Sequence, residues 1–281
     1  MRTQSVDTSP EFERIQIARI RAFSVAKKFT SIRSWTQSMA YANLETTPGS
    51  SPQDRAMEFV AREYGSHLAH LFAHAIETQH PWNLQAPDIQ EATLPIIKIA
   101  EQIGIPILIM GSMASSIYGF PRSIQDVDFL ANFNEDHIAF LCDHLKHTYA
   151  FDPDEITLAL LQRESFSVLH RSRLIKIDVI LPSTALEKEA LERRQPHMLI
   201  EGSAPLFLPS PEDMTLLNLI DYQRQENAAD DRWNDILGLL KVQAPTINVT
   251  SLCQRAAMLG IAALLSQALI DAGIHSETPV S

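Results

Sequence analysis

Residues 107–129 read ILIMGSMASSIYGFPRSIQDVDF, and this stretch decides the fold. Its first four residues, Ile107 to Met110, form a continuous apolar run, which is typical of a strand buried on both faces. Gly111 and Ser112 then mark a turn into a short helix, and a loop leads to a second strand that starts at Asp126. The order of strand, helix and strand predicts an α/β core.

The Gly-Ser turn is a candidate anion-binding site. Gly111 has no Cβ atom, so the backbone there can approach a ligand closely. The free N–H groups at a helix start and the positive end of the helix dipole favour a phosphate. The Ser112 hydroxyl can either cap the helix or donate a hydrogen bond to a phosphate oxygen. We therefore expect Gly111 and Ser112 to bind the phosphates of a nucleotide.

Three aspartates form a candidate metal site. Asp126 and Asp128 are two residues apart on the second predicted strand, so both point to the same face. Residues 174–181 read LIKIDVIL and predict a neighbouring strand that carries Lys176 and Asp178 on one face. Carboxylate oxygens suit Mg²⁺, and three carboxylates can hold two metal ions about 3.5–4 Å apart. The alternative is that Asp126 and Asp128 cap loops or face solvent.

Two cationic side chains accompany these aspartates in the sequence. Arg122 either neutralises triphosphate charge through its forked donors or forms an ordinary ion pair with Asp126 or Glu135. Lys176 either binds the triphosphate or balances the carboxylates, because clustered acids repel one another without a cation. We expect both residues to contribute to nucleotide binding.

The chain resembles the nucleotidyltransferase superfamily with the DNA polymerase β-like fold. More narrowly, it resembles the AbiEii-type toxin-like nucleotidyltransferases of bacteria. The resemblance covers roughly residues 90 to 275 and therefore most of the chain. It is carried by Gly111-Ser112, by residues 118–123 leading into Asp126-Val127-Asp128, by Lys176-Ile177-Asp178, and by residues 209–214 and 231–237.

The resemblance implies a function and assigns roles. The Gly-Ser turn is similar to the family's triphosphate cradle, Asp126 and Asp128 to its metal ligands, and Asp178 to the third acid that helps activate the acceptor hydroxyl. The implied reaction moves a nucleoside monophosphate from a nucleoside triphosphate to tRNA or to a protein side chain. Two Mg²⁺ ions are the implied cofactors, and a cognate antitoxin is a possible partner.

The sequence departs from the family pattern at two positions. The family's turn often reads Gly-Gly-Ser, and Met110 stands here in place of the first glycine. The family also places a lysine on the helix that follows the Pro-Glu-Asp segment, where this chain has Asn218. A lysine would offer a point charge to phosphates. These departures support an alternative reading, in which the fold is a catalytically impaired module that docks a partner, for instance in a toxin–antitoxin pair.

Composition and charge limit the other possibilities. The chain has 281 residues and a net charge of −11, so one large or two modest domains are expected and broad duplex binding is disfavoured. No apolar run approaches the roughly 18 residues that cross a bilayer. Cys142 and Cys253 have no metal-ligand spacing. We expect a cytoplasmic protein with no membrane partner.

The predicted organisation has three parts and is mostly helical at both ends. Residues 1–90 form a helical N-terminal extension, residues 91–209 the catalytic core with a mixed sheet, and residues 210–281 a helical C-terminal region. We predict a hairpin of strands at 165–170 and 174–181. The predicted helices lie near residues 10–30, 52–80, 93–102, 134–149, 153–163, 187–194, 211–225, 230–241, 249–258 and 260–273, whereas residues 31–44 are ambiguous.

Two other patterns have a functional and a structural interpretation. His67, His70 and His74 share one face of a predicted helix, which indicates either a transition-metal site or a helix face against the core. The segment 11–33 is rich in arginine and lysine. It is either a solvated helix packed on the domain or a contact for RNA or a partner.

Overall fold

The fold is known from a computed structural model. It describes residues 2–5, 7–78, 82–199, 205–224 and 230–274. Contacts between residues divide the chain into two compact units. The helical unit comprises Met1–Thr30, Met110–Pro121 and Arg193–Ser281, and the sheet unit comprises Ser31–Ile109 and Arg122–Glu192. The predicted boundaries near residues 90 and 209 stay a prediction.

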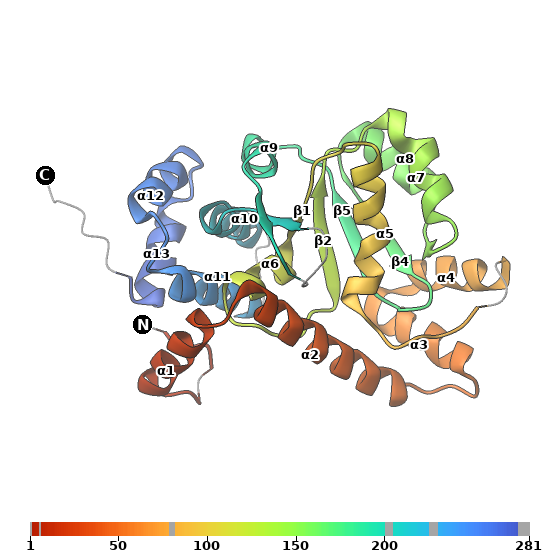
Figure 1. Cartoon of the computed structure of the whole chain (residues 1–281), viewed down its shortest axis with the longest axis horizontal. Helices are drawn as coiled ribbons and strands as arrows, with labels where there is room; N and C mark the ends of the chain where they lie inside the picture. Colours follow the sequence, from red (N-terminus) through yellow and green to blue (C-terminus); the bar gives the residue numbers. More distant parts are fainter. Residues whose placement is uncertain (1, 6, 79–81, 200–204, 225–229, 275–281) are drawn as a thin grey trace, which may run out of the picture. The chain divides into compact units, whose positions relative to one another are not determined.

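A five-stranded sheet forms the centre of the sheet unit (Figure 1). Its order is β1 (Ile107–Met110), β2 (Asp126–Ala131), β5 (Lys176–Ile180), β4 (Ser165–His170) and β3 (Tyr149–Ala150). Strands β2 and β5 are parallel, whereas β4 pairs antiparallel with both β5 and β3. The predicted mixed sheet and its hairpin are therefore confirmed.

Burial alternates along the two parallel strands. Val127 and Phe129 of β2 and Ile177 and Val179 of β5 are buried, whereas the residues between them are partly exposed. Because successive side chains of a strand point to opposite faces, the sheet has one apolar and one polar face here. Helices α5 (Ile89–Gln102), α7 (Ile138–Leu145, after a short 3₁₀ turn at Glu135–His137), α8 (Pro153–Gln162) and α9 (Ala185–Glu192) complete this part of the unit.

The N-terminal helices differ from their predicted limits. The helix predicted near residues 10–30 is α1 (Pro10–Arg21) followed by α2 (Val25–Glu45), which takes in the ambiguous segment. The helix predicted over 52–80 is also two helices, α3 (Pro52–Tyr64) and α4 (Ser66–Thr78). They are separated by Gly65, whose φ of 92° is incompatible with a continuing right-handed helix.

The histidine face of α4 does not lie against the core. His67, His70 and His74 are exposed, whereas Leu68, Phe72 and Ile76 are buried. The interpretation as a core-facing histidine stripe is therefore wrong, because the apolar residues at the alternate helical positions take the buried side. His67 instead pairs with Glu155 through a contact of 2.7 Å.

The helical unit is built around α11 (Asp230–Gln243). This helix contacts α1, α6 (Gly111–Tyr118), α10 (Pro211–Arg224) and α13 (Ala262–Ala272). Its contact with α6 is close, since a Cβ atom on Gly119 would lie 2.8 Å from the backbone nitrogen of Leu239. The unit also contains α12 (Val249–Met258) and the strand pair β6 (Gln195–His197) and β7 (Leu206–Leu208). The predicted C-terminal helices are confirmed.

Candidate active site

The predicted acidic residues lie together on the polar face of the sheet. Asp128 of β2 is aligned with Asp178 of β5, and Asp126 is aligned with Lys176. Aligned residues of neighbouring strands point to the same side of a sheet. Ser167 of β4 is aligned with Asp178 from the other side. We call Asp126, Asp128, Asp178 and Lys176 the acidic cluster, and all four come from within the sheet unit.

Lys176 provides the positive charge of the acidic cluster. Its Nζ lies 2.7 Å from Oδ2 of Asp178 and 3.8 Å from Oδ2 of Asp126. Ser167 Oγ donates a hydrogen bond of 2.5 Å to the other carboxylate oxygen of Asp178. Both oxygens of Asp178 are therefore engaged, and the ammonium group bridges two strands.

The acidic cluster contains three aspartates and one lysine, and this imbalance is one cause of the pKa shifts within it. Burial raises the pKa of Asp126, and the neighbouring charge of Asp178 raises it further, although Lys176 and Arg122 act in the opposite direction. Burial alone lowers the pKa of Lys176. The hydrogen bond to Asp178 and the charges of the three aspartates outweigh burial, so the pKa of Lys176 is raised.

Tyr64 holds the ends of the two parallel strands, and no sequence pattern pointed to it. Its hydroxyl lies 3.0 Å from the carbonyl oxygens of both Gln125 and Leu174, which stand just before β2 and β5. Burial raises the pKa of this phenol, and the charge of Asp126 adds to the shift. Tyr64 therefore acts as a neutral positioning residue for the strands that carry the aspartates.

Arg122 lies at the edge of the acidic cluster. Its Nη1 donates a hydrogen bond of 3.0 Å to the carbonyl oxygen of Ser123. Its charge also contributes to lowering the pKa of Asp126, in opposition to burial. This position suits a partial counter-charge for Asp126, and the predicted contact with a triphosphate stays a prediction.

Gly111 and Ser112 lie in the helical unit, at the start of α6. Gly111 has a φ of 62°, which explains a glycine at this position. The helix begins at Gly111 with Met110 as its N-cap residue and no capping side chain. Ser112 is thus inside the first turn and does not cap the helix, because the N-cap position falls on Met110, two residues earlier. The Ser112 hydroxyl oxygen is buried and has no hydrogen-bond partner among the described residues.

Asn218 has a structural contact within the helical unit. Its Nδ2 donates a hydrogen bond of 2.9 Å to Oγ of Ser115, so it joins α10 to α6. The residue that replaces the expected lysine is therefore a neutral amide that is already used in packing. It supplies no positive charge for a phosphate.

The carboxylates of the acidic cluster fit a divalent cation by their chemistry, but they do not form a ready-made metal centre. Across the described ranges, no group of three or more histidine, cysteine, aspartate or glutamate side chains is placed to hold a metal ion. Lys176 contacts Asp126 and Asp178 and supplies the cation there. Carboxylate oxygens are hard donors of the kind that Mg²⁺ prefers.

Comparisons with known proteins assign no family to the chain. No family model matches it, and no curated protein sequence matches it. Among solved structures it is similar to an antigenic nucleotidyltransferase-like protein from Paracoccidioides brasiliensis, with 14% sequence identity and a TM-score of 0.39. That match covers 64% of this chain and 92% of the other one. A similarity of this size carries no functional argument. No described helix has the length and hydropathy needed to cross a membrane.

Proposed function

We propose that the chain is a metal-dependent nucleotidyltransferase. It moves a nucleoside monophosphate from a nucleoside triphosphate to an acceptor hydroxyl, with release of pyrophosphate. The observation that carries this proposal is the alignment of Asp128 with Asp178 on a polar sheet face that also holds Asp126. Three carboxylates on two neighbouring strands are a donor set that suits the divalent cations of phosphoryl transfer.

The three carboxylates of the acidic cluster divide two tasks between them. Asp126 and Asp128 would hold Mg²⁺ through their carboxylate oxygens. Asp178 completes the site and orients or deprotonates the acceptor hydroxyl. When bound, Mg²⁺ supplies neutralisation of the charge that develops on the transferred phosphate. The protein itself contributes positioning and electrostatic stabilisation, because phosphoryl transfer needs little covalent help from side chains.

Lys176 has a task in each of two states. Without nucleotide, its ammonium group contacts Asp126 and Asp178 and balances part of their charge. With a divalent cation bound, Lys176 would be placed to offer its positive charge to the anionic triphosphate. Arg122, whose charge reaches Asp126, supports the same triphosphate through its forked donors.

Gly111 and Ser112 bind the β- and γ-phosphates in this proposal. The positive φ of Gly111 and the unpartnered hydroxyl of Ser112 support this assignment. The first turn of α6 offers backbone N–H groups and the positive end of a helix dipole. The acceptor is a hydroxyl of tRNA or of a protein, as the resemblance to toxin-like nucleotidyltransferases implies, and a cognate antitoxin would then block the site.

The deciding experiment follows an α-labelled nucleoside triphosphate in the presence of Mg²⁺, total tRNA and cell protein. We expect label to appear on one acceptor class with wild-type protein, and Asp128→Asn to lower the rate by about 10²–10³-fold or more. Asp154→Asn is the matched control, because Asp154 is an exposed acid on α8 of the same unit. Equal labelling by wild type and Asp128→Asn would overturn the proposal.

Two observations favour a second candidate function, a binding module without activity. Asn218 is used in a hydrogen bond to Ser115 at the position where a lysine is expected, and Lys176 engages two of the three acids. Calorimetric titration with Mg²⁺ and a triphosphate separates the two functions. Saturable, Mg²⁺-dependent binding supports the enzyme, whereas its absence leaves the binding module.

A further inference from the structure

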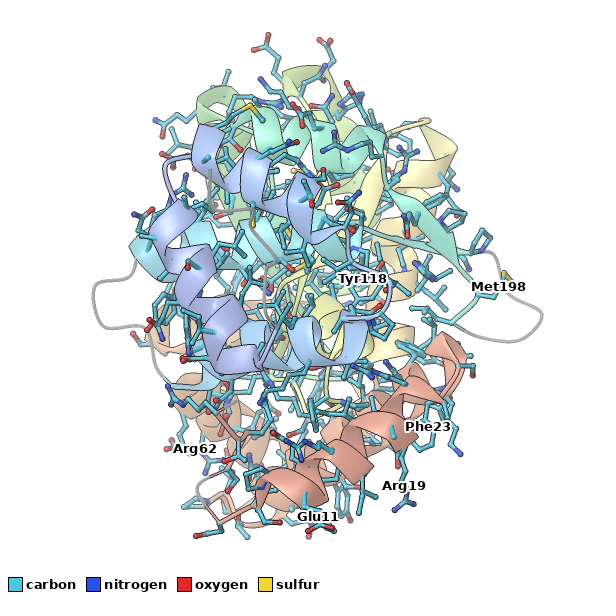
Figure 2. The ribbon with its side chains drawn as sticks, turned by 90° about the vertical axis from the view of Figure 1, so that its left-hand side faces the viewer. Glu11, Arg19, Phe23, Arg62, Tyr118 and Met198 are labelled. Carbon is cyan, nitrogen blue, oxygen red and sulfur yellow. The ribbon has the colours of Figure 1, made fainter. Side chains whose placement is uncertain are left out.

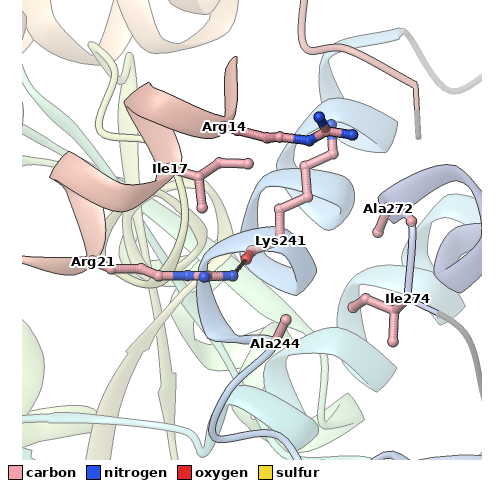
Figure 3. A pocket seen from close by; sticks show the side chains of 8 residues that line it. Arg14, Ile17, Arg21, Lys241, Ala244, Ala272 and Ile274 are labelled. Atoms are coloured by element: carbon pink, nitrogen blue, oxygen red, sulfur yellow. Dashed lines mark hydrogen bonds between the residues drawn. The ribbon is translucent and has the colours of Figure 1, made fainter. Parts of the chain in front are cut away.

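A cavity of about 220 Å³ lies within the helical unit, between α1, α11 and α13 (Figure 3). Three cationic side chains line it: Arg14 and Arg21 of α1, and Lys241 of α11. Ile17, Ala244 and Ile274 add apolar surface. Figure 3 shows Arg14 and Arg21 extending from α1 toward α11, with Ile17 between them in the chain.

Lys241 does not offer its charge to a ligand. Its Nζ donates hydrogen bonds of 3.2 Å to both carboxylate oxygens of Glu13 and a further one to the carbonyl oxygen of Arg2. The side chains of Lys241 and Glu13 are 1% and 0% exposed. The three N–H donors of the ammonium group are therefore used, and the pair is neutral as a whole.

Arg21 is held in place by the end of α11. Its Nε donates a hydrogen bond of 3.0 Å to the carbonyl oxygen of Val242, and its Nη2 donates to the carbonyl oxygen of Lys241. These carbonyl groups belong to the last turn of the helix, where a cation is favoured. They fix the guanidinium group without neutralising its full charge.

Arg14 has no hydrogen bond or ion pair among the residues that the structure describes. Its guanidinium group lines the cavity with all five donors available. No carboxylate lines the cavity either. The chain as a whole carries a net charge of −11, so two arginines without a carboxylate partner at one cavity are a local concentration of positive charge.

We propose that this cavity binds a small organic anion, namely a carboxylate or phosphate monoester on a compact apolar body. The anionic group contacts Arg14 and Arg21, whose planar guanidinium groups match carboxylate and phosphate oxygens. The apolar body packs on Ile17, Ala244 and Ile274. Ligand pockets for drug-sized molecules are about 300–1,000 Å³. The ligand is therefore smaller than a nucleoside triphosphate, and the site is independent of the proposed transfer reaction.

The test is calorimetric titration of the full chain at low ionic strength with three probes: phenyl phosphate, benzoate and inorganic phosphate. We expect wild-type protein to bind at least one of the two aromatic anions at millimolar concentration or below. Arg14→Gln should weaken this binding about tenfold or more. The two aromatic probes distinguish a phosphate ligand from a carboxylate ligand.

Arg19→Gln is the matched control, because Arg19 is exposed on the same helix and points away from the helical unit (Figure 2). The substitution removes the same charge as Arg14→Gln, but Arg19 does not line the cavity. We expect Arg19→Gln to bind the aromatic probes with the same affinity as wild-type protein. Equal losses in Arg14→Gln and Arg19→Gln would show a general charge effect and overturn the proposal, as would the absence of binding for both aromatic probes.

A second variant tests the apolar part of the cavity. Ala244 is half-buried and lines the cavity, so Ala244→Leu should fill part of it. We expect this change to weaken the aromatic probe more than inorganic phosphate. Equal binding of the aromatic probe to Ala244→Leu and wild type would place the ligand outside the cavity and overturn the assignment.

Discussion

Lys176 of the sheet unit and Lys241 of the helical unit both pair with carboxylates, but their pKa values shift in opposite directions. The pKa of Lys176 is raised and that of Lys241 is lowered. Burial lowers both. At Lys176 the hydrogen bond to Asp178 and the charges of three aspartates outweigh burial. At Lys241 the charges of Glu13 and Asp271 and the hydrogen bond to Glu13 do not outweigh burial, and the charge of Arg2 adds to the lowering.

The two centres also differ in access to solvent. The side chains of Lys176 and Asp178 are 22% and 18% exposed, whereas those of Lys241 and Glu13 are 1% and 0% exposed. A sealed pair with balanced charge can only stabilise or destabilise the fold. An accessible cluster with surplus negative charge can exchange its lysine for another cation. The acidic cluster around Lys176 is therefore better suited to binding a cation or a substrate than the buried Lys241–Glu13 pair.

The largest expected change in stability follows from breaking the buried Lys241–Glu13 pair. Glu13→Gln leaves the ammonium group of Lys241 buried without its carboxylate, so we expect the free energy of unfolding to fall by about 3–5 kcal/mol. Urea denaturation measures this change. Glu11→Gln is the matched control, because Glu11 is exposed on the same helix (Figure 2) and should change stability little.

A double variant sharpens the same prediction. Glu13→Leu combined with Lys241→Met removes both charges and keeps apolar volume, so it should recover most of the stability lost in Glu13→Gln. If the double variant were as unstable as Glu13→Gln, the loss in the free energy of unfolding would come from packing around α1 and α11 rather than from the unpaired charge.

The next largest effect concerns metal binding at the acidic cluster. Lys176→Met removes the cation that competes with a metal ion at Asp126 and Asp178, so we expect Mn²⁺ to bind about tenfold more tightly. One charge at about 4 Å contributes roughly 4 kcal/mol at an effective dielectric constant of about 20, and the partial exposure of these side chains reduces that figure. Paramagnetic resonance titration measures free Mn²⁺.

Lys98→Met is the control for Lys176→Met, because Lys98 is exposed on α5 of the same unit. Its Mn²⁺ affinity should match that of wild type. If Lys176→Met bound Mn²⁺ no better than Lys98→Met, Lys176 would not compete for the metal position.

A smaller effect follows from the raised pKa of Asp126. Asp126 contributes to the free energy of unfolding below the ordinary pKa of an aspartate. This contribution is lost as the pH rises through the raised pKa of Asp126 in the folded state. Asp126→Asn should therefore be slightly more stable than wild type at pH 7, and this advantage should disappear in acid. Thermal unfolding at a series of pH values checks the sign. A variant less stable at pH 7 would contradict the direction of the shift.

The smallest effect is expected at Ser167. Ser167→Ala removes the hydrogen bond to Oδ1 of Asp178 and should lower the free energy of unfolding by about 1 kcal/mol. Ser165→Ala is the control, since Ser165 is exposed on the same face of β4. Chemical denaturation compares the two, and an equal loss in both variants would show that Ser167 does not support the acidic cluster.

Local patterns in the sequence were enough to predict many elements. The apolar run of β1, the hairpin of β4 and β5 and the C-terminal helices lie close to their predicted positions. Hydrophobic periodicity and capping residues act over a few neighbouring positions, so they can be read directly. The same patterns placed Asp126 and Asp128 on one face and Lys176 and Asp178 on another strand.

Predictions failed where the deciding contacts are not local. Ser112 could have capped α6, but the helix starts at Gly111 and its N-cap position falls on Met110, two residues before Ser112. The histidines of α4 share a helix face as predicted, but that face is exposed because a competing apolar stripe is buried. A sequence pattern identifies a face and leaves open what the face packs against.

Local sequence patterns were sufficient for the fold class, for the mixed α/β core and for the presence of three aspartates on strands. Only the tertiary structure decided that Asp128 stands beside Asp178, that Lys176 contacts two of the acids, and that Glu13 meets Lys241 across 228 residues of chain. The physical reason is that strand register and helix packing depend on contacts summed over the whole fold. The cavity lined by Arg14 and Arg21 arises in the same way, from helices far apart in the sequence.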